Sequence, residues 1–172
     1  MSASFDNVCR AAELVQKARD LYAEAVKTCV DGLGAEVFAL LRDQAEGQLE
    51  RLAEVSRAMS RNADWAGACA LSGEDAPDLR GAFRGMAQGH APEGACLTEL
   101  GAARAALAVN DDLVAFFEAW TAGADLIHEA TFARRLAEEQ RGQRLMLADL
   151  VDYYEDPEDW ALRQDNAILD GA

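Results

Sequence analysis

The sequence contains few residues that interrupt helices and no stretch that marks a membrane span. It has only three prolines in 172 residues, while alanine, leucine and glutamate, which favour helices, are abundant. No stretch approaches the roughly 20 apolar residues that a transmembrane helix needs. The first residues, MSASFDNVCRAAELV, lack the basic segment and apolar run of a secretory signal. We therefore expect a helical protein of the cytoplasm with no membrane partner.

Basic residues and paired cysteines are also scarce. The chain has 16 Lys and Arg against 31 Asp and Glu, which gives a net charge of -15. A surface with this charge repels the phosphate backbone of nucleic acids and anionic lipids, so we expect no nucleic-acid partner. The four cysteines form no C-x-x-C pair. The sequence therefore encodes no zinc or iron–sulfur knuckle.

Four long stretches repeat apolar residues every three or four positions, as amphipathic helices do. They span about residues 5–30, 35–60, 97–121 and 126–154. Short glycine-containing turns separate the members of each pair, so each pair is expected to form an antiparallel hairpin. A proline follows the last stretch at position 157 and ends it, because the residue before a proline avoids the helical conformation.

The periodicity fades over residues 61–95, which collect glycines and two of the three prolines. This segment is interpreted as a crossover connection between the two hairpins. A short helix is expected inside it at about residues 78–86, with Trp65, Leu79 and Phe83 covering one end of the bundle. The crossover would therefore close the core at a single end.

The two hairpins align with each other at a constant offset of 95 residues, as a duplicated hairpin does. The matched pairs include Leu14 with Val109, Leu41 with Leu136, Gly47-Gln48 with Gly142-Gln143, and Leu52 with Leu147. We therefore predict an all-α fold in one domain over residues 1–172. It is a four-helix bundle of two repeated hairpins joined by the long crossover. A short C-terminal helix, about residues 158–169, is expected to lay Trp160, Leu162 and Ile168 against the bundle.

The segment from Phe132 to Tyr154 reads FARRLAEEQRGQRLMLADLVDYY and carries two amides on its apolar stripe, Gln140 and Gln143. It resembles the LAEEExxHxxLL helix of the rubrerythrin-like branch of the ferritin-like superfamily. Gln140 stands where that pattern has a ligand Glu, and Gln143 stands where it has a His. The resemblance implies a ferritin-like bundle. In that family a di-iron site takes one Glu from each of two helices and a Glu-x-x-His pair from each of the other two.

None of the six positions that this resemblance assigns to metal ligands carries a carboxylate or an imidazole. They are Val15, Ala45, Gln48, Asn110, Gln140 and Gln143. Neutral amides do not replace four carboxylates and two imidazoles around a cation. The neighbouring Glu46, Glu138 and Glu139 are expected to point away from the centre into solvent, because one residue turns a helical side chain by about 100°. We therefore expect no metal and no other cofactor.

Three functions remain open at this point. The favoured one is a metal-free, non-catalytic scaffold or interaction protein with a degenerate di-iron site. We expect a homodimer, because Leu40 and Phe116 suggest that their helices carry a second apolar face that a monomer would leave exposed. An unidentified protein partner is also compatible with this function. The first alternative is a rubrerythrin-type di-iron oxidoreductase or peroxidase that uses displaced ligands. The second is a small-molecule binding module with a polar pocket at Gln48, Asn110, Gln140 and Gln143.

Overall fold

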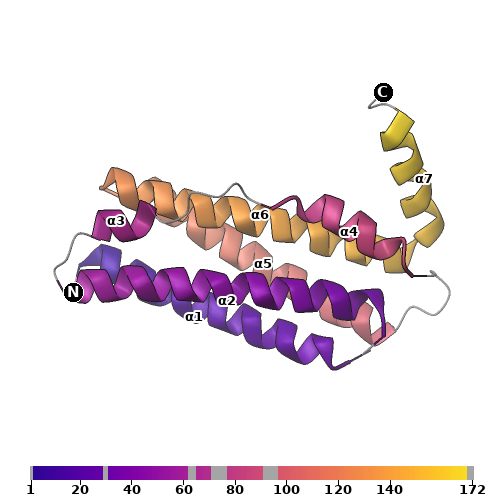
Figure 1. Cartoon of the computed structure of the whole chain (residues 1–172), viewed down its shortest axis with the longest axis horizontal. Coiled ribbons are helices and arrows are strands. Elements are labelled where there is room, and N and C mark those ends of the chain that lie inside the picture. The colour runs from indigo at the N-terminus through magenta and orange to yellow at the C-terminus, as the bar shows by residue number, and fades with distance from the viewer. Residues whose placement is uncertain (1, 29–30, 62–64, 71–76, 91–96, 170–172) are drawn as a thin grey trace.

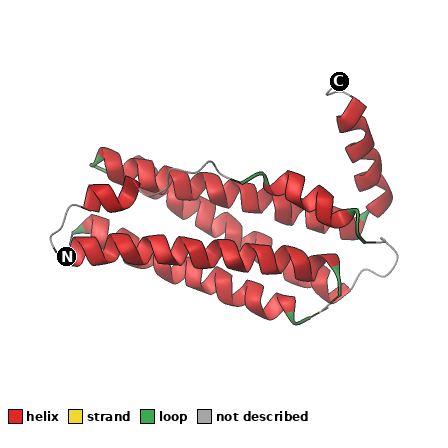
Figure 2. Cartoon of the chain, viewed as in Figure 1, coloured by secondary structure: helices red, strands yellow, loops and turns green. Residues whose placement is uncertain are grey.

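The computed structural model describes residues 2–28, 31–61, 65–70, 77–90 and 97–169, with the backbone alone for residues 97 and 165–169. Every regular element within these residues is a helix, as Figure 2 shows. The predicted all-α class is therefore confirmed for this part of the chain. None of the described helices combines the length and the apolar character that crossing a membrane requires.

Four long helices form the body of the molecule. They are α1 (Ala3–Val26), α2 (Leu33–Ser60), α5 (Leu97–Gly123) and α6 (Ile127–Glu155). Helix α1 packs along α2, α5 packs along α6, and α1 also lies against α5. In Figure 1 the members of each sequential pair run in opposite directions, whereas α2 and α5 run in the same direction. The segment between α2 and α5 therefore has to return along the length of the bundle.

The ends of these helices follow local chemistry. Helix α1 begins where the Ser2 hydroxyl oxygen accepts a hydrogen bond from the Phe5 N–H at 3.4 Å, as an N-cap residue does. It ends at Val26, earlier than predicted, and Cys29 and Val30 lie outside the described residues. Helix α6 ends at Glu155, and α7 (Pro157–Leu169) starts directly after Asp156, as the proline predicts.

Two short helices of the crossover, α3 (Trp65–Ala70) and α4 (Leu79–Ala87), each contact both α2 and α6. The predicted helix at residues 78–86 is therefore confirmed as α4, whereas α3 was not predicted. The two lie toward opposite ends of the bundle in Figure 1. Together they cover the side on which α2 and α6 face each other.

The prediction that Trp65 and Phe83 cover the same end is wrong. The Trp65 ring lies 4.3 Å from the His128 ring at the start of α6, whereas the Phe83 ring lies 6.4 Å from the Tyr153 ring near its end. At 1.5 Å per residue, positions 128 and 153 are separated by about 37 Å along the helix. The crossover therefore closes both ends of the bundle.

Helix α7 packs on the bundle through one aromatic side chain. The Trp160 ring lies 5.6 Å from the Phe83 ring and 5.4 Å from the Tyr153 ring. Leu162 is 62% exposed, so its predicted packing is wrong. The reason is that α7 turns away from the bundle after Asp156, as Figure 1 shows. The side chain of Ile168 lies outside the described residues.

The N-terminus of α2 is capped by residues of α5 and α6. Its own N-cap residue, Gly32, offers no side-chain oxygen. The buried Glu99 carboxylate of α5 lies there instead, and the Tyr154 hydroxyl accepts from the Gly34 N–H at 3.1 Å and donates to Glu99. A carboxylate is stabilised at this end of a helix by the helix dipole. This contact joins the start of α2 to both α5 and α6.

Gly34→Ala is expected to lower the free energy of unfolding by about 1.5–3 kcal/mol, the scale of a lost hydrogen bond to a charged group. A Cβ at position 34 would lie 2.7 Å from the Glu99 Cδ atom, so the carboxylate must leave its place under Tyr154. Gly47→Ala is the matched control, because no atom lies within 4 Å of its added Cβ, and it should stabilise α2 by about 0.5–1 kcal/mol. Urea denaturation of both variants measures the difference. Equal stabilisation by both substitutions would exclude the cap.

Candidate functional site

The six positions that the resemblance assigns to metal ligands all lie inside the bundle. Val15 is on α1, Ala45 and Gln48 are on α2, Asn110 is on α5, and Gln140 and Gln143 are on α6. Each is at most 2% exposed. All four long helices therefore contribute to the same buried layer, and four of its six side chains are amides.

Three of the four amides form a hydrogen-bonded chain. The Asn110 Nδ2 donates to Gln140 Oε1 at 2.7 Å, and the Gln140 Nε2 donates to Gln48 Oε1 at 2.7 Å. The Gln48 Nε2 then donates to Glu139 Oε2 at 2.9 Å. Every amide donates in the same direction, towards the Glu139 carboxylate. Aligned bonds of this kind polarise and strengthen one another in a low-dielectric interior.

The prediction that Glu139 points into solvent is wrong, because it is only 6% exposed. Its carboxylate accepts two hydrogen bonds from Arg51, at 2.6 and 2.8 Å, and one from Arg135 Nε at 3.2 Å. The turn of about 100° from Gln140 directs it towards α2 instead of water. Glu46 and Glu138 are exposed, as predicted. The amide chain thus ends on a carboxylate held by two guanidinium groups.

Two opposing effects set the charge state of Glu139. Burial raises the pKa of a carboxyl group, because the charged form loses its hydration. The hydrogen bonds and positive charge of Arg51, together with hydrogen bonds from Gln48 and Arg135, outweigh burial and leave the pKa of Glu139 below its ordinary value. Glu139 is therefore an anion at neutral pH.

Three buried polar atoms beside the amide chain have no hydrogen-bond partner among the described residues. They are the Tyr22 hydroxyl, Asn110 Oδ1 and Gln143 Nε2. Burial raises the pKa of Tyr22, and a hydrogen bond from the Asn110 side chain acts in the opposite direction. This contact lies outside the distance or angle of an ordinary hydrogen bond, so it leaves the Tyr22 hydroxyl without a full partner. The four amides therefore do not satisfy one another completely, since Gln143 is not joined to the chain.

Glu129 and Asp149, like Glu99, are buried carboxylates that the sequence did not predict. Glu129 accepts hydrogen bonds from Trp120 Nε1 at 2.7 Å and from the Ser4 hydroxyl at 2.8 Å. Asp149 accepts from Arg80 of α4 at 3.2 and 3.3 Å, which ties the crossover to α6. Each carboxylate lies among donors from other elements, and within the described part of the chain no three His, Cys, Asp or Glu residues gather in a metal-binding group.

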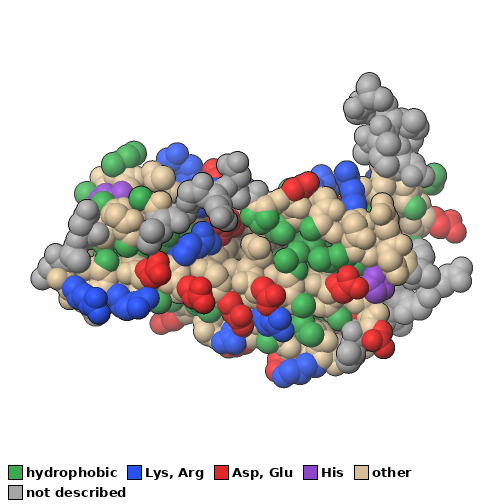
Figure 3. Space-filling model, in the orientation of Figure 1, with side chains coloured by type: hydrophobic (Ala, Val, Ile, Leu, Met, Phe, Trp, Pro, Cys, Tyr) green, Lys and Arg blue, Asp and Glu red, His purple; other side chains and the backbone are tan. Residues whose placement is uncertain are grey.

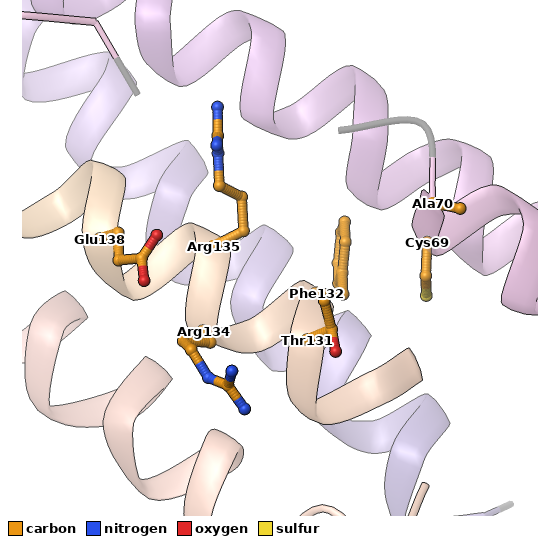
Figure 4. A pocket seen from close by; sticks show the side chains of 7 residues that line it. All are labelled: Cys69, Ala70, Thr131, Phe132, Arg134, Arg135 and Glu138. Carbon is orange, nitrogen blue, oxygen red and sulfur yellow. The ribbon is translucent and has the colours of Figure 1, made fainter. Parts of the chain in front are cut away.

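A depression of about 300 Å³ lies between α3 and α6. Its lining, drawn in Figure 4, is Cys69, Ala70, Thr131, Phe132, Arg134, Arg135 and Glu138. Burial, and to a smaller extent the negative charge of Glu129, raise the pKa of the Cys69 thiol to about 11. A thiol with this pKa is protonated at neutral pH and is a poor nucleophile. The depression therefore carries no activated cysteine.

Comparison with known proteins gives no further assignment: no protein-family model, curated protein or solved structure matches this chain. The residues and their geometry therefore have to indicate the function. The most informative of these are the buried amides and the ion-paired carboxylate on which their hydrogen-bonded chain ends.

Proposed function

We propose that this chain is a ferritin-like, rubrerythrin-related bundle that serves as a metal-free, non-catalytic scaffold or interaction protein. The amide chain of Asn110, Gln140 and Gln48 is the observation that carries this proposal, because it occupies three positions where the resemblance requires metal ligands. These amides form hydrogen bonds with one another and with Glu139. The groups used in these bonds are therefore not available to a cation. A homodimer and a cytoplasmic location belong to the same proposal.

The ion cluster on α2 and α6 argues against a site built from displaced ligands. Glu139 is the buried carboxylate that touches the amide chain, and its two oxygens already accept from Arg51 and Arg135. A divalent cation there would have to displace two guanidinium groups or bind beside their positive charge, and both cost free energy. Among the residues that the structure describes, the oxidoreductase alternative therefore has no available carboxylate next to the amides.

Metal analysis of protein purified from iron-supplemented cells tests this proposal. We expect well under one iron per chain, and no ferroxidase or peroxidase turnover above that of free iron. Added Fe²⁺ or Mn²⁺ should leave the melting temperature unchanged relative to a chelator-treated sample, since a ligand that binds only the folded state raises it. Stoichiometric, tightly bound iron would contradict the proposal and support the di-iron oxidoreductase.

The homodimer gives a separate prediction. Leu40 and Phe116 are partly buried against the core, so neither offers a fully exposed apolar face. The most exposed large apolar side chains among the described residues are Leu126, Ile127, Leu145 and Leu162. The face drawn in Figure 3 also shows hydrophobic side chains gathered where α4 meets α2, between acidic and basic ones. Light scattering at high concentration should give twice the chain mass of 18.5 kDa, and a strictly monomeric mass would exclude the dimer.

A further inference from the structure

The charge of Glu139 fixes the orientation of every amide in the chain. An ionised carboxylate only accepts hydrogen bonds, so Gln48 must present its Nε2 to Glu139. The Gln48 Oε1 then faces Gln140, which must donate through Nε2 and accept from Asn110 through Oε1. Asn110 therefore keeps its Nδ2 towards Gln140 and its Oδ1 away from the chain. Asn110 Oδ1 is therefore left without a partner because Glu139, at the other end of the chain, is charged.

The positions of their residues on the helices place the three unpaired atoms near this end of the chain. Gln143 lies one helical turn after Gln140 on the same face of α6, and Asn110 is bonded to Gln140. The Tyr22 hydroxyl of α1 neighbours the Asn110 amide. The three side chains that carry these atoms are at most 1% exposed. A buried polar atom without a partner costs about 1–3 kcal/mol, so three such atoms in one region call for a ligand.

We propose that Asn110, Gln143 and Tyr22 hold one internal water molecule at the centre of the bundle. The groups present one acceptor, Asn110 Oδ1, one donor, Gln143 Nε2, and one hydroxyl that does either. A water molecule donates to the first, accepts from the second, and keeps one further hydrogen bond for Tyr22. Buried waters typically make about three such bonds to groups that the protein leaves unpaired.

The same groups disfavour an ion. A cation would find one amide oxygen and one hydroxyl, too few oxygens to offset its lost hydration. An anion would face the Asn110 oxygen, which the aligned amide chain makes more negative. The water site rests on the proposed metal-free core, because a metal at the six positions would occupy the same space.

Nuclear magnetic resonance of the chelator-treated, ¹⁵N-labelled full chain tests the water site. The probe is bulk water, and the readout is the rotating-frame Overhauser effect between water and side-chain amide protons. We expect cross peaks of dipolar sign at the Gln143 Nε2 protons. The Gln140 Nε2 protons are the internal control, since they are bonded to Gln48 and should give weaker peaks or none. Resolved Gln143 signals without a water cross peak would overturn the inference.

Two variants separate a bound water from proton exchange through the tyrosine hydroxyl. The Gln143 cross peak should persist in Tyr22→Phe, which removes the hydroxyl, and its disappearance there would reject the water. In Asn110→Leu the water loses its acceptor and the peak should vanish, while a retained peak would also count against the site. If Asn110→Leu does not fold, the natural chain and Tyr22→Phe decide.

Bound iron in the metal analysis would contradict the proposed function, whereas a metal-free chain without the cross peak contradicts the water site alone.

Discussion

Glu139→Leu is expected to lower the free energy of unfolding by about 3 kcal/mol, the lower end of the range for breaking a buried ion pair from one side. The substitution leaves Arg51 and Arg135 without their shared carboxylate and removes the acceptor of Gln48 Nε2. The two guanidinium groups keep some solvent contact, with 25% and 19% of their side chains exposed, so water offsets part of the loss. A domain of this size has a total stability of only about 5–15 kcal/mol.

Glu138→Leu is the matched control for this prediction. Glu138 precedes Glu139 on the same helix but is exposed and makes no hydrogen bond or ion pair with the described residues. A surface substitution of this kind usually changes stability by less than about 0.5 kcal/mol. Urea denaturation followed by circular dichroism measures both variants. Equal losses would show that the Glu139 ion cluster contributes nothing beyond helix propensity.

Glu139 also determines how the free energy of unfolding changes with pH. The pKa of Glu139 lies below its ordinary value of 4.5 in the folded chain, so its ionised form stabilises the fold above that value. This contribution is lost as the pH falls through the folded-state pKa. The stability difference between the natural chain and Glu139→Gln should therefore be constant near neutrality and shrink in acid.

Restoring all six metal ligands is expected to convert the chain into one that needs metal to fold. The variant combines Val15→Glu, Ala45→Glu, Gln48→His, Asn110→Glu, Gln140→Glu and Gln143→His. Without metal, its four buried carboxylates lose hydration and repel one another, and the effective penalty is several kcal/mol per ion. The apo form should then be largely unfolded. Mn²⁺ or Fe²⁺ should restore the helical fold, since metal binding free energy becomes folding free energy.

A neutral variant separates charge from size in this experiment. Val15→Gln, Ala45→Gln and Asn110→Gln enlarge the same positions without adding carboxylates. This variant should lose stability through overpacking, about 1–3 kcal/mol per site, and through any buried amide left without a partner, and it should not respond to metal. Thermal unfolding with chelator and with Mn²⁺ compares the two. If the variant with six substitutions is stable without metal, or does not respond to metal, the helices do not direct these positions to one centre.

The sequence predicts the long helices well because their signals are local. Apolar periodicity and the glycine turns set the main bounds, and Pro157 separates α6 from α7. Helix α3 has six residues, fewer than two turns, so it carries no periodic signal. The burial of Glu139 depends on how closely α2 approaches α6, which no pattern within one helix reports. The one feature of the sequence that indicates this burial is the spacing of Arg135 and Glu139, since residues four apart on a helix form ion pairs.

The 95-residue repeat also explains why the amide chain could not be derived completely from the sequence. Gln48 and Gln143 are equivalent in the two hairpins, but Gln140 corresponds to Ala45 and Asn110 corresponds to Val15. The second hairpin therefore holds amides where the first has apolar side chains. A hydrogen-bonded chain built from these residues cannot follow the internal symmetry. It includes Gln48 and leaves its counterpart Gln143 outside.

The long connection that the parallel course of α2 and α5 requires also separates the two pairs of helices during synthesis of the chain. Each hairpin forms from helices that are adjacent in sequence, a type of contact that folds quickly. The ribosome completes α2 before α5 begins, and at about 5–20 residues per second α6 follows roughly 5–20 s later. During that interval the stripe containing Leu41, Gln48 and Leu52 has no second hairpin to bury it. The nascent pair of α1 and α2 therefore exposes apolar surface that the finished molecule buries, and such surface favours aggregation.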